Sequence, residues 1–338
     1  MKHPLSVTLL LIGMFLLAQV IGLSLVSLSI KDVAVVNGAT VIEHTTTAIG
    51  DRPDFVGWES FLYLVGGVLV GTGLLLLLIK FRKVRLWKFW FFLAVFLATS
   101  VAFGVLLPQL VALALALVLA FLKVYWPNPW VHNFSELFIY AGIAVLLVPI
   151  FDVFWMVVVL LAISVYDMIA VWRTKHMVAM AQFQTKSEMF AGLMVPKRES
   201  APGPVAKMSP EAQETIPTVS ISSKLRTTAA RTATQKMVSV KPGTKPLPPP
   251  PSSPQVSHAV LGGGDVAFPM LFAGAVMEGL IRSGLARAPA LFESLIVVAF
   301  AAVALTLLLI FAKKDRFYPA MPFLTAGCLL GWVVTMLL

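Results

Sequence analysis

Two aspartates stand inside long apolar stretches of this chain. Asp167 belongs to the segment Ser164-Val165-Tyr166-Asp167-Met168, and Asp265 follows three glycines in Leu261-Gly262-Gly263-Gly264-Asp265. A charged side chain inside a bilayer costs at least a few kcal/mol, and each glycine weakens a helix by about 1 kcal/mol relative to alanine. Two carboxyl groups that meet in such surroundings share one proton and can work as an acid and a base. We therefore interpret Asp167 and Asp265 as the residues that carry the chemistry.

The rest of the sequence describes the elements that must hold these two residues. Of its 338 residues, 59% are hydrophobic and only 12% are charged, against about a quarter charged in soluble domains. Several apolar runs approach or exceed the ~20 residues that cross ~30 Å of hydrocarbon. The sequence predicts an all-α membrane protein with nine transmembrane helices, over residues 5–30, 57–79, 89–107, 111–125, 134–151, 153–172, 258–282, 290–312 and 319–338.

Cysteine and histidine are too sparse to suggest a metal centre. The single cysteine, Cys328, excludes an intramolecular disulfide and a cysteine-based metal cluster. The five histidines are scattered, without a helical His-x3-His pair or a neighbouring acidic cluster. We therefore expect neither a metal nor another cofactor.

The basic residues indicate how the chain lies in the membrane. The net charge of +10 could indicate nucleic-acid binding, but residues 173–257 alone hold about twelve Lys and Arg against four Glu. Positive loops mark the cytoplasmic ends of membrane helices, and residues 80–88 and 313–316 are also basic. Even numbers of predicted helices separate these three segments. We expect them and the N-terminus on the cytoplasmic side, the C-terminus outside, and contact with the lipid bilayer rather than with nucleic acid.

The composition divides the chain into four parts. Residues 1–130 are expected to form a bundle of four helices. Residues 131–194 add helices five and six with Asp167, and a short amphipathic helix over Lys175–Met194 on the membrane surface. Residues 195–257, rich in Pro, Ser, Thr and Lys, predict a disordered cytoplasmic linker. Residues 258–338 hold the last three helices and Asp265.

Counting along the predicted helices places the two aspartates at a similar depth. Asp167 lies six residues before Arg173, or roughly 9 Å from the cytoplasmic end of its helix, and Asp265 lies seven residues after His258, or roughly 10 Å. Glu278 is about 20 Å further along its helix than Asp265, so it is too distant to be the partner. Asp152, predicted at the external turn between helices five and six, is likewise too far away.

A third segment, Tyr318–Pro322, enters the membrane from the same end. Its two X-Pro steps oppose a regular helix. One interpretation is proline near a helix N-terminus, which is common. The other is exposed backbone that pairs with an extended substrate strand beside the aspartates, as the backbone of Gly262–Gly264 could also do.

The spacing alone leaves two kinds of function open. In a hydrolase, one aspartate activates a water molecule that attacks a peptide carbonyl, while the other, protonated, donates to the carbonyl oxygen. In a transporter, the same pair would bind a coupling ion or proton at a helix broken by the glycines. In a third interpretation, the two aspartates only form contacts between helices and have no chemical role.

At these residues the sequence resembles the presenilin and signal peptide peptidase family of intramembrane aspartyl proteases. Tyr166-Asp167 matches the family's YD motif, and Gly262-x-Gly264-Asp265 matches its GxGD motif. Pro319-Ala320-Met321 matches its PAL motif, with methionine in place of leucine, an exchange that packed sites accept. The resemblance covers the C-terminal half apart from the linker, and it is closest to a prokaryotic, archaeal presenilin homologue.

This resemblance implies a nine-helix GxGD protease whose catalytic residues are Asp167 and Asp265. It implies transmembrane-helix peptides as substrates and a multi-pass protein of the cell membrane. Tyr166, Gly262, Gly264, Pro319, Ala320 and Met321 are then expected to position the substrate and the aspartates. A homo-oligomer is left open.

Overall fold

The computed structural model describes residues 5–36, 39–55, 57–81, 84–126, 128–173, 190–196, 258–311 and 318–338. Apart from residues 195 and 196, the predicted linker over 195–257 lies outside this set. Most of the predicted surface helix also lies outside it. The described residues belong to one compact unit, which comprises residues 1–196 and 258–338.

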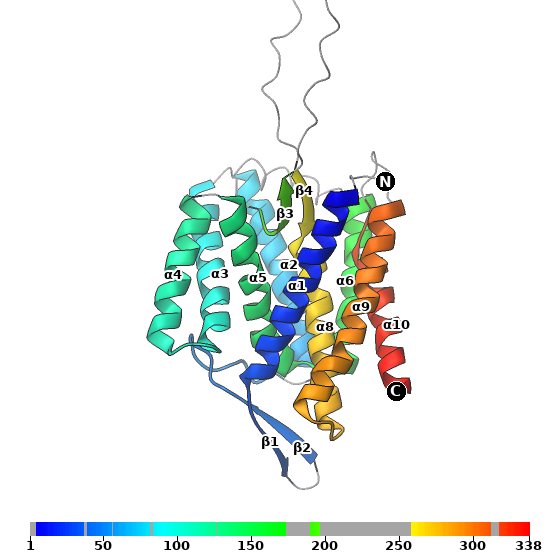
Figure 1. Cartoon of the computed structure of the whole chain (residues 1–338). Coiled ribbons are helices and arrows are strands. Elements are labelled where there is room, and N and C mark those ends of the chain that lie inside the picture. Colours follow the sequence, from blue (N-terminus) through cyan, green and yellow to red (C-terminus); the bar gives the residue numbers. More distant parts are fainter. Residues whose placement is uncertain are drawn as a thin grey trace, which may run out of the picture. The chain divides into compact units, whose positions relative to one another are not determined.

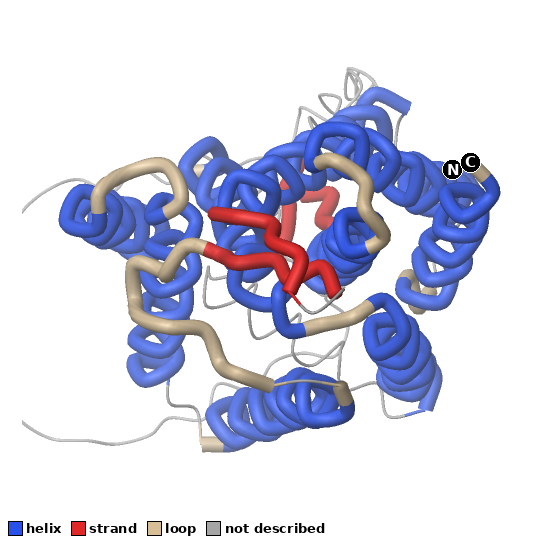
Figure 2. Tube along the Cα trace, turned by 90° about the horizontal axis from the view of Figure 1, so that it is seen from below, coloured by secondary structure: helices blue, strands red, loops and turns tan. Residues whose placement is uncertain are grey.

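Long apolar helices make up most of the described residues. Seven are long and apolar enough to cross a membrane, and two shorter apolar helices accompany them. The nine helices run roughly side by side, and most are seen end-on when viewed along the bundle (Figures 1 and 2). Their number confirms the prediction, and their bounds are α1 Leu5–Ser29, α2 Trp58–Lys80, α3 Val84–Gly104, α4 Gln109–Tyr125, α5 Pro129–Leu147, α6 Val153–Met168, α8 Gly263–Arg282, α9 Arg287–Phe311 and α10 Met321–Leu337.

Short polar or proline-containing breaks set the ends of several helices. Asn128 caps α5, because its side chain accepts a hydrogen bond from the Trp130 amide, and Pro129 takes the first helical position. Asp152 caps α6 by accepting from the Trp155 amide over 2.8 Å. Asp152 therefore has a local structural role at the turn between α5 and α6.

Helix α8 lies at the centre of the packing. It contacts α1, α5, α6, α9 and α10, and every residue from Pro269 to Glu278 is buried. Helices α3 and α4 pack on the far side of α5, and α2 packs mainly on α6. The helix that carries Asp265 is thus held on all sides by the rest of the bundle.

Two antiparallel strand pairs lie at opposite ends of this bundle (Figure 1). Strands β1 Ile30–Val36 and β2 Ala39–His44 form a hairpin between α1 and α2. Strands β3 Gly192–Pro196 and β4 His258–Gly262 pair with each other, Gly192 opposite Gly262 and Pro196 opposite His258. The second pair joins segments that are more than sixty residues apart in the sequence.

This second pair corrects two predictions. The surface helix over Lys175–Met194 is wrong at its end, because residues from Gly192 onward form β3. The seventh membrane helix begins at Gly263 rather than at His258, because residues before it form β4. Leu193, Val195, Ala259 and Leu261 are buried on one face of the pair, whereas Met194 and Val260 between them are more exposed. This period of two favours strand over helix.

Candidate active site

Asp167 lies at the junction of α6 and α10. It is the second-last residue of α6, whose chain continues as a π-helix over Ile169–Arg173, and it is only 6% exposed. The Met321 amide donates to its Oδ2 atom over 3.1 Å, and the Ala320 amide also bonds to this carboxyl group. Because these amides open α10, a helix N-terminus faces the carboxylate and favours its negative charge.

Asp265 lies at the first turn of α8. It is the third helical residue after the cap, Gly262, and its carboxyl group turns back toward the Gly262 amide. An acidic residue in this position satisfies the amide of the cap residue and complements the helix dipole. A Cβ on Gly262 would lie only 3.1 Å from Asp265 Oδ2. The absence of a side chain at Gly262 therefore leaves the room that the carboxyl group occupies.

The two aspartates are close enough to interact electrostatically. They come from α6 and α8, which pack against each other, and both helices also contact α10. The Asp167 carboxyl group thus faces two backbone amides at the start of α10, and the Asp265 carboxyl group faces the Gly262 amide at the start of α8.

The remaining motif residues differ in what they contact. Pro319 is buried, and Ala320 and Met321 supply the amides that face Asp167. Pro322 is the second residue of α10, a position where its missing N–H costs no helical hydrogen bond. The Tyr166 hydroxyl donates to Thr72 Oγ1 over 3.2 Å and so connects α6 to α2. Gly264 is exposed on the first turn of α8.

Comparison with known protein families settles the class of protein. The family model described as "Signal-peptide peptidase, presenilin aspartyl protease" matches residues 12–338. The chain belongs to this family. It is therefore an aspartyl protease that acts on peptides within the membrane, and the match gives no support to an ion-coupled transporter.

Solved structures agree on the fold. A presenilin family intramembrane aspartate protease solved in space group C222 superposes with a TM-score of 0.55 at 18% identity, over 98% of each chain. A structure of a presenilin family intramembrane aspartate protease in space group P2 gives a TM-score of 0.52 at 17% identity, over 97% of this chain and 96% of the other. A comparison with curated protein sequences found no match.

Several buried polar residues near Asp167 and Asp265 were not singled out from the sequence. Ser164 of α6 and Thr325 of α10 share a hydrogen bond of 2.7 Å, one turn from Asp167 and from Met321. The Gln19 side chain of α1 donates to the carbonyl oxygen of Val266 over 2.8 Å. Their signal in the sequence was faint, since each is a single polar residue in an apolar helix.

Gln19 bonds to α8 close to a proline inside that helix. Pro269 lies inside α8 and offers no N–H to the carbonyl group of Asp265, four residues earlier. Gln19 reaches the next carbonyl group, that of Val266, from the neighbouring helix. The helix that carries Asp265 is thereby held in place where its own hydrogen bonding is weakened.

An apolar cavity of about 550 Å³ adjoins the first turn of α8. Residues of α3 and α5 line it together with Gly263, Gly264 and Ala267. Glu136 and Tyr140 of α5 also line it, and the Tyr140 hydroxyl donates to Glu136. Lys123 of α4 forms a fully buried ion pair with Glu136 at 2.6 Å. This pair keeps the charge of Glu136 balanced beside the cavity.

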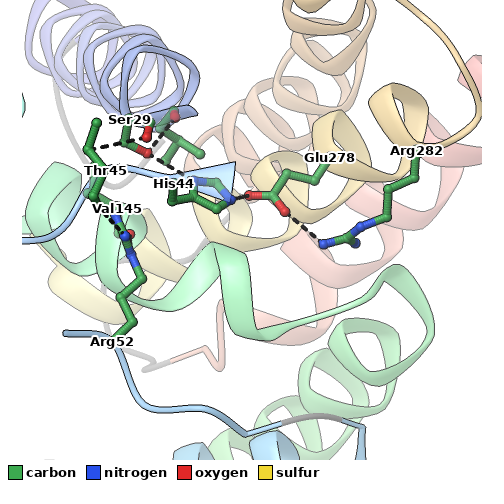
Figure 3. A network of polar contacts seen from close by, with 8 residues as sticks. Ser29, His44, Thr45, Arg52, Val145, Glu278 and Arg282 are labelled. Atoms are coloured by element: carbon green, nitrogen blue, oxygen red, sulfur yellow. Dashed lines mark hydrogen bonds and ion pairs between the residues drawn. The ribbon is translucent and has the colours of Figure 1, made fainter. Parts of the chain in front are cut away.

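Glu278 has its own partners at the other end of α8. Its carboxyl group contacts His44 Nε2 at 3.2 Å and Arg282 Nη2 at 2.9 Å (Figure 3). Arg52 lies nearby and donates to the carbonyl oxygen of Val145 over 3.1 Å. Burial lowers the pKa of the Arg52 guanidinium, and the negative charge of Glu278 opposes this shift. The structure thus gives Glu278 a role in anchoring the β1–β2 hairpin, thirteen residues from Asp265.

Proposed function

We propose that Asp167 and Asp265 are the catalytic pair of this intramembrane protease. The observation that carries the proposal is the set of N–H groups opening α10 that face Asp167, with Asp265 close enough to interact with it. Such an arrangement fixes one carboxyl group by rigid backbone donors while the other approaches from a second helix. A positioned acid or base of this kind contributes typically about 10²–10⁴-fold to the rate of a reaction.

The reaction that this pair performs is hydrolysis of a peptide bond. The ionised aspartate takes a proton from a water molecule as the water oxygen attacks the carbonyl carbon. The protonated aspartate donates to the carbonyl oxygen, and the tetrahedral intermediate forms. The aspartate that took the proton from water then donates it to the amide nitrogen as the C–N bond breaks, and the other aspartate takes back its proton as the carbonyl group forms again. The products are a carboxylic acid and an amine.

The substrate must lose its helical hydrogen bonds before attack, because a helix in lipid already pairs all its backbone groups. We place the unwound segment beside β4, which leads directly into Asp265. Within the described residues β4 pairs only with β3, so its other edge can accept a strand. Gly262 and Gly264 keep that approach free of side chains, while Pro319, Ala320 and Met321 hold Asp167. Tyr166 is assigned to orienting the end of α6 through Thr72.

The orientation in the membrane follows from the charge distribution. We place the N-terminus and residues 173–257 on the cytoplasmic side and the C-terminus outside, which puts the aspartates near the cytoplasmic surface. The substrates are transmembrane-helix peptides. We divide the chain into the four parts predicted from its composition, which end at residues 130, 194, 257 and 338. Homo-oligomers are compatible with this arrangement.

The proposal is tested with purified protein and a model single-span substrate. Asp167→Asn and Asp265→Asn keep the shape of each side chain and remove the titrating group, so each should abolish cleavage while thermal unfolding stays close to that of the wild type. Asp152→Asn is the matched control, because asparagine also caps a helix well, and it should cleave normally. Mass analysis of the products gives the readout. Turnover retained in either active-site variant would end the two-aspartate assignment.

A further inference from the structure

Helix α5 closes one edge of the β3–β4 pair with side chains. The Asn133 amide nitrogen donates to the carbonyl oxygen of Met194 over 2.7 Å, and the Met194 amide donates to Asn133 Oδ1 over 2.9 Å. One residue earlier, His132 Nε2 lies 2.8 Å from the carbonyl oxygen of Gly192. Asn133 therefore offers a strand residue the same donor and acceptor that a neighbouring strand would offer.

These contacts show which backbone groups of β3 point outward. In an antiparallel pair, residues that face each other alternate between those that exchange hydrogen bonds and those whose backbone groups point away. Met194 and Gly192 direct their backbone groups toward α5, so they belong to the outward-pointing set. The pairs Leu193 with Leu261 and Val195 with Ala259 then exchange the hydrogen bonds of the sheet.

The same alternation identifies the open edge of β4. Val260 faces Met194, and Gly262 faces Gly192, so the backbone groups of Val260 and Gly262 point away from β3. The contact of the Gly262 amide with the Asp265 carboxyl group agrees with this direction. The amide and carbonyl groups of Val260 and the carbonyl group of Gly262 thus form a short hydrogen-bonding edge beside Asp265. Within the described residues no strand occupies it.

We propose that Asn133, assisted by His132, is a specificity-determining residue that closes the outer edge of β3 and so directs the substrate strand to β4. The proposal rests on the strand addition described under the proposed function. A two-stranded sheet otherwise offers two edges of similar chemistry. Because neighbouring strands lie about 4.8 Å apart, a peptide on the edge of β3 would be about 10 Å from β4. Such a peptide would lie on the side away from Asp265.

Helix α5, which carries Asn133, is held in place by further buried contacts. On the same helix, Glu136 forms the buried ion pair with Lys123, and Tyr140 lies against Gly263, the first residue of α8. A Cβ on Gly263 would lie 3.2 Å from the Tyr140 hydroxyl and 3.4 Å from the carbonyl oxygen of Ala191. Helix α5 therefore contacts both β3 and the start of α8. Asn133 thus holds β3 against α5, beside the strand that leads into Asp265.

The first experiment compares cleavage by the wild type, Asn133→Ala and Asn133→Asp. Alanine removes both hydrogen bonds to Met194, and aspartate keeps the acceptor but loses the donor. We expect kcat and KM to fall together, by at least about twofold because the two edges have similar chemistry, since a peptide held on the edge of β3 is bound but lies too far from Asp265 to be cleaved. Asn128→Ala, a substitution at the start of the same helix, should keep the kcat and KM of the wild type.

The second experiment measures by cross-linking whether the substrate peptide lies beside β4 or beside β3. Cys328→Ser provides a background without cysteine, and single cysteines are then placed at Val260 or Met194. A substrate peptide that carries one cysteine should cross-link to Val260→Cys alone, because directly opposite residues on neighbouring strands have Cβ atoms about 5 Å apart. After Asn133→Ala, cross-linking to Met194→Cys should appear.

The two experiments separate this inference from the proposed function. If the wild type cleaves through Asp167 and Asp265 but both Asn133 variants keep its kcat, KM and cross-link, the role of Asn133 is refuted and the catalytic pair stands. The same conclusion holds if these variants lose only thermal stability. If the Asp265→Asn variant cleaves the substrate, the proposed function itself fails, whatever the Asn133 variants do.

Discussion

Replacing Gly262 by alanine tests whether the close contact at Asp265 serves catalysis. Gly262 has φ −61° and ψ 144°, angles that alanine adopts without strain. The added Cβ would lie 3.1 Å from Asp265 Oδ2 and 3.7 Å from its Cγ atom, so the carboxyl group must move by a few tenths of an ångström. Since a misplacement of about 1 Å can cost 10²-fold in rate, we expect kcat to fall about tenfold.

The stability of this variant should change in the opposite direction. Alanine at an unstrained glycine position restricts the unfolded chain and stabilises a protein by about 0.4–1 kcal/mol. Gly66→Ala in α2 is the matched control, because no atom lies within 4 Å of its new Cβ. Gly264→Ala is an intermediate case, since its Cβ would meet only the Phe268 ring at 3.6 Å, an ordinary contact.

The assay measures kcat with a single-span substrate and thermal unfolding on the same preparations. We expect kcat to be lowest for Gly262→Ala, with unfolding temperatures at or above that of the wild type for all three variants. A Gly262→Ala enzyme with wild-type kcat would show that the Asp265 carboxyl group need not occupy the space above Gly262. A loss of kcat that only follows a loss of stability would refute the argument as well.

Two further substitutions test the buried polar contacts. Thr325→Val removes the hydroxyl that bonds Ser164, and because Ser164 still donates to the carbonyl oxygen of Leu160 at 2.7 Å, thermal or chemical unfolding should show a loss of only about 1 kcal/mol. Lys123→Met leaves Glu136 buried without its cation and should destabilise the fold by about 3–5 kcal/mol. Adding Glu136→Gln should recover much of this loss, and a double variant no more stable than Lys123→Met would contradict the explanation.

The membrane helices could be predicted from sequence because their cause is local. A run of about 20 apolar residues must cross the bilayer as a helix, whatever its neighbours are. The start of the third helix was predicted too late, at residue 89, because the basic segment at residues 80–88 was interpreted as a turn. Helix α3 begins at Val84, since lysine and arginine are good helix formers. The β1–β2 hairpin also had a local signal, the dipeptide Asn37-Gly38 between two alternating segments.

The β3–β4 pair could not be predicted in the same way, because its cause is not local. Gly192–Pro196 is short, and its partner begins only at His258, so the strand is defined by a contact that periodicity does not reveal. The error carried over to the depth of Asp265, which was counted along a helix from His258. Strand residues rise about 3.3 Å each instead of 1.5 Å, so that count holds only from Gly263 onward.

Three consecutive glycines before Asp265 would weaken a membrane helix if they all lay inside it. The structure places the change from strand to helix at Gly262 and Gly263, so the cost of glycine inside a helix largely disappears. Gly262 leaves space for the Asp265 carboxyl group, and Gly263 leaves space for Tyr140 and for the backbone at Ala191. A continuous helix would have kept its backbone groups paired with each other. The joint instead presents the Gly262 N–H group to Asp265 and, within the described residues, leaves the other edge of β4 without a partner strand at the same place. A protease needs such an edge when its substrate arrives with every backbone hydrogen bond already made.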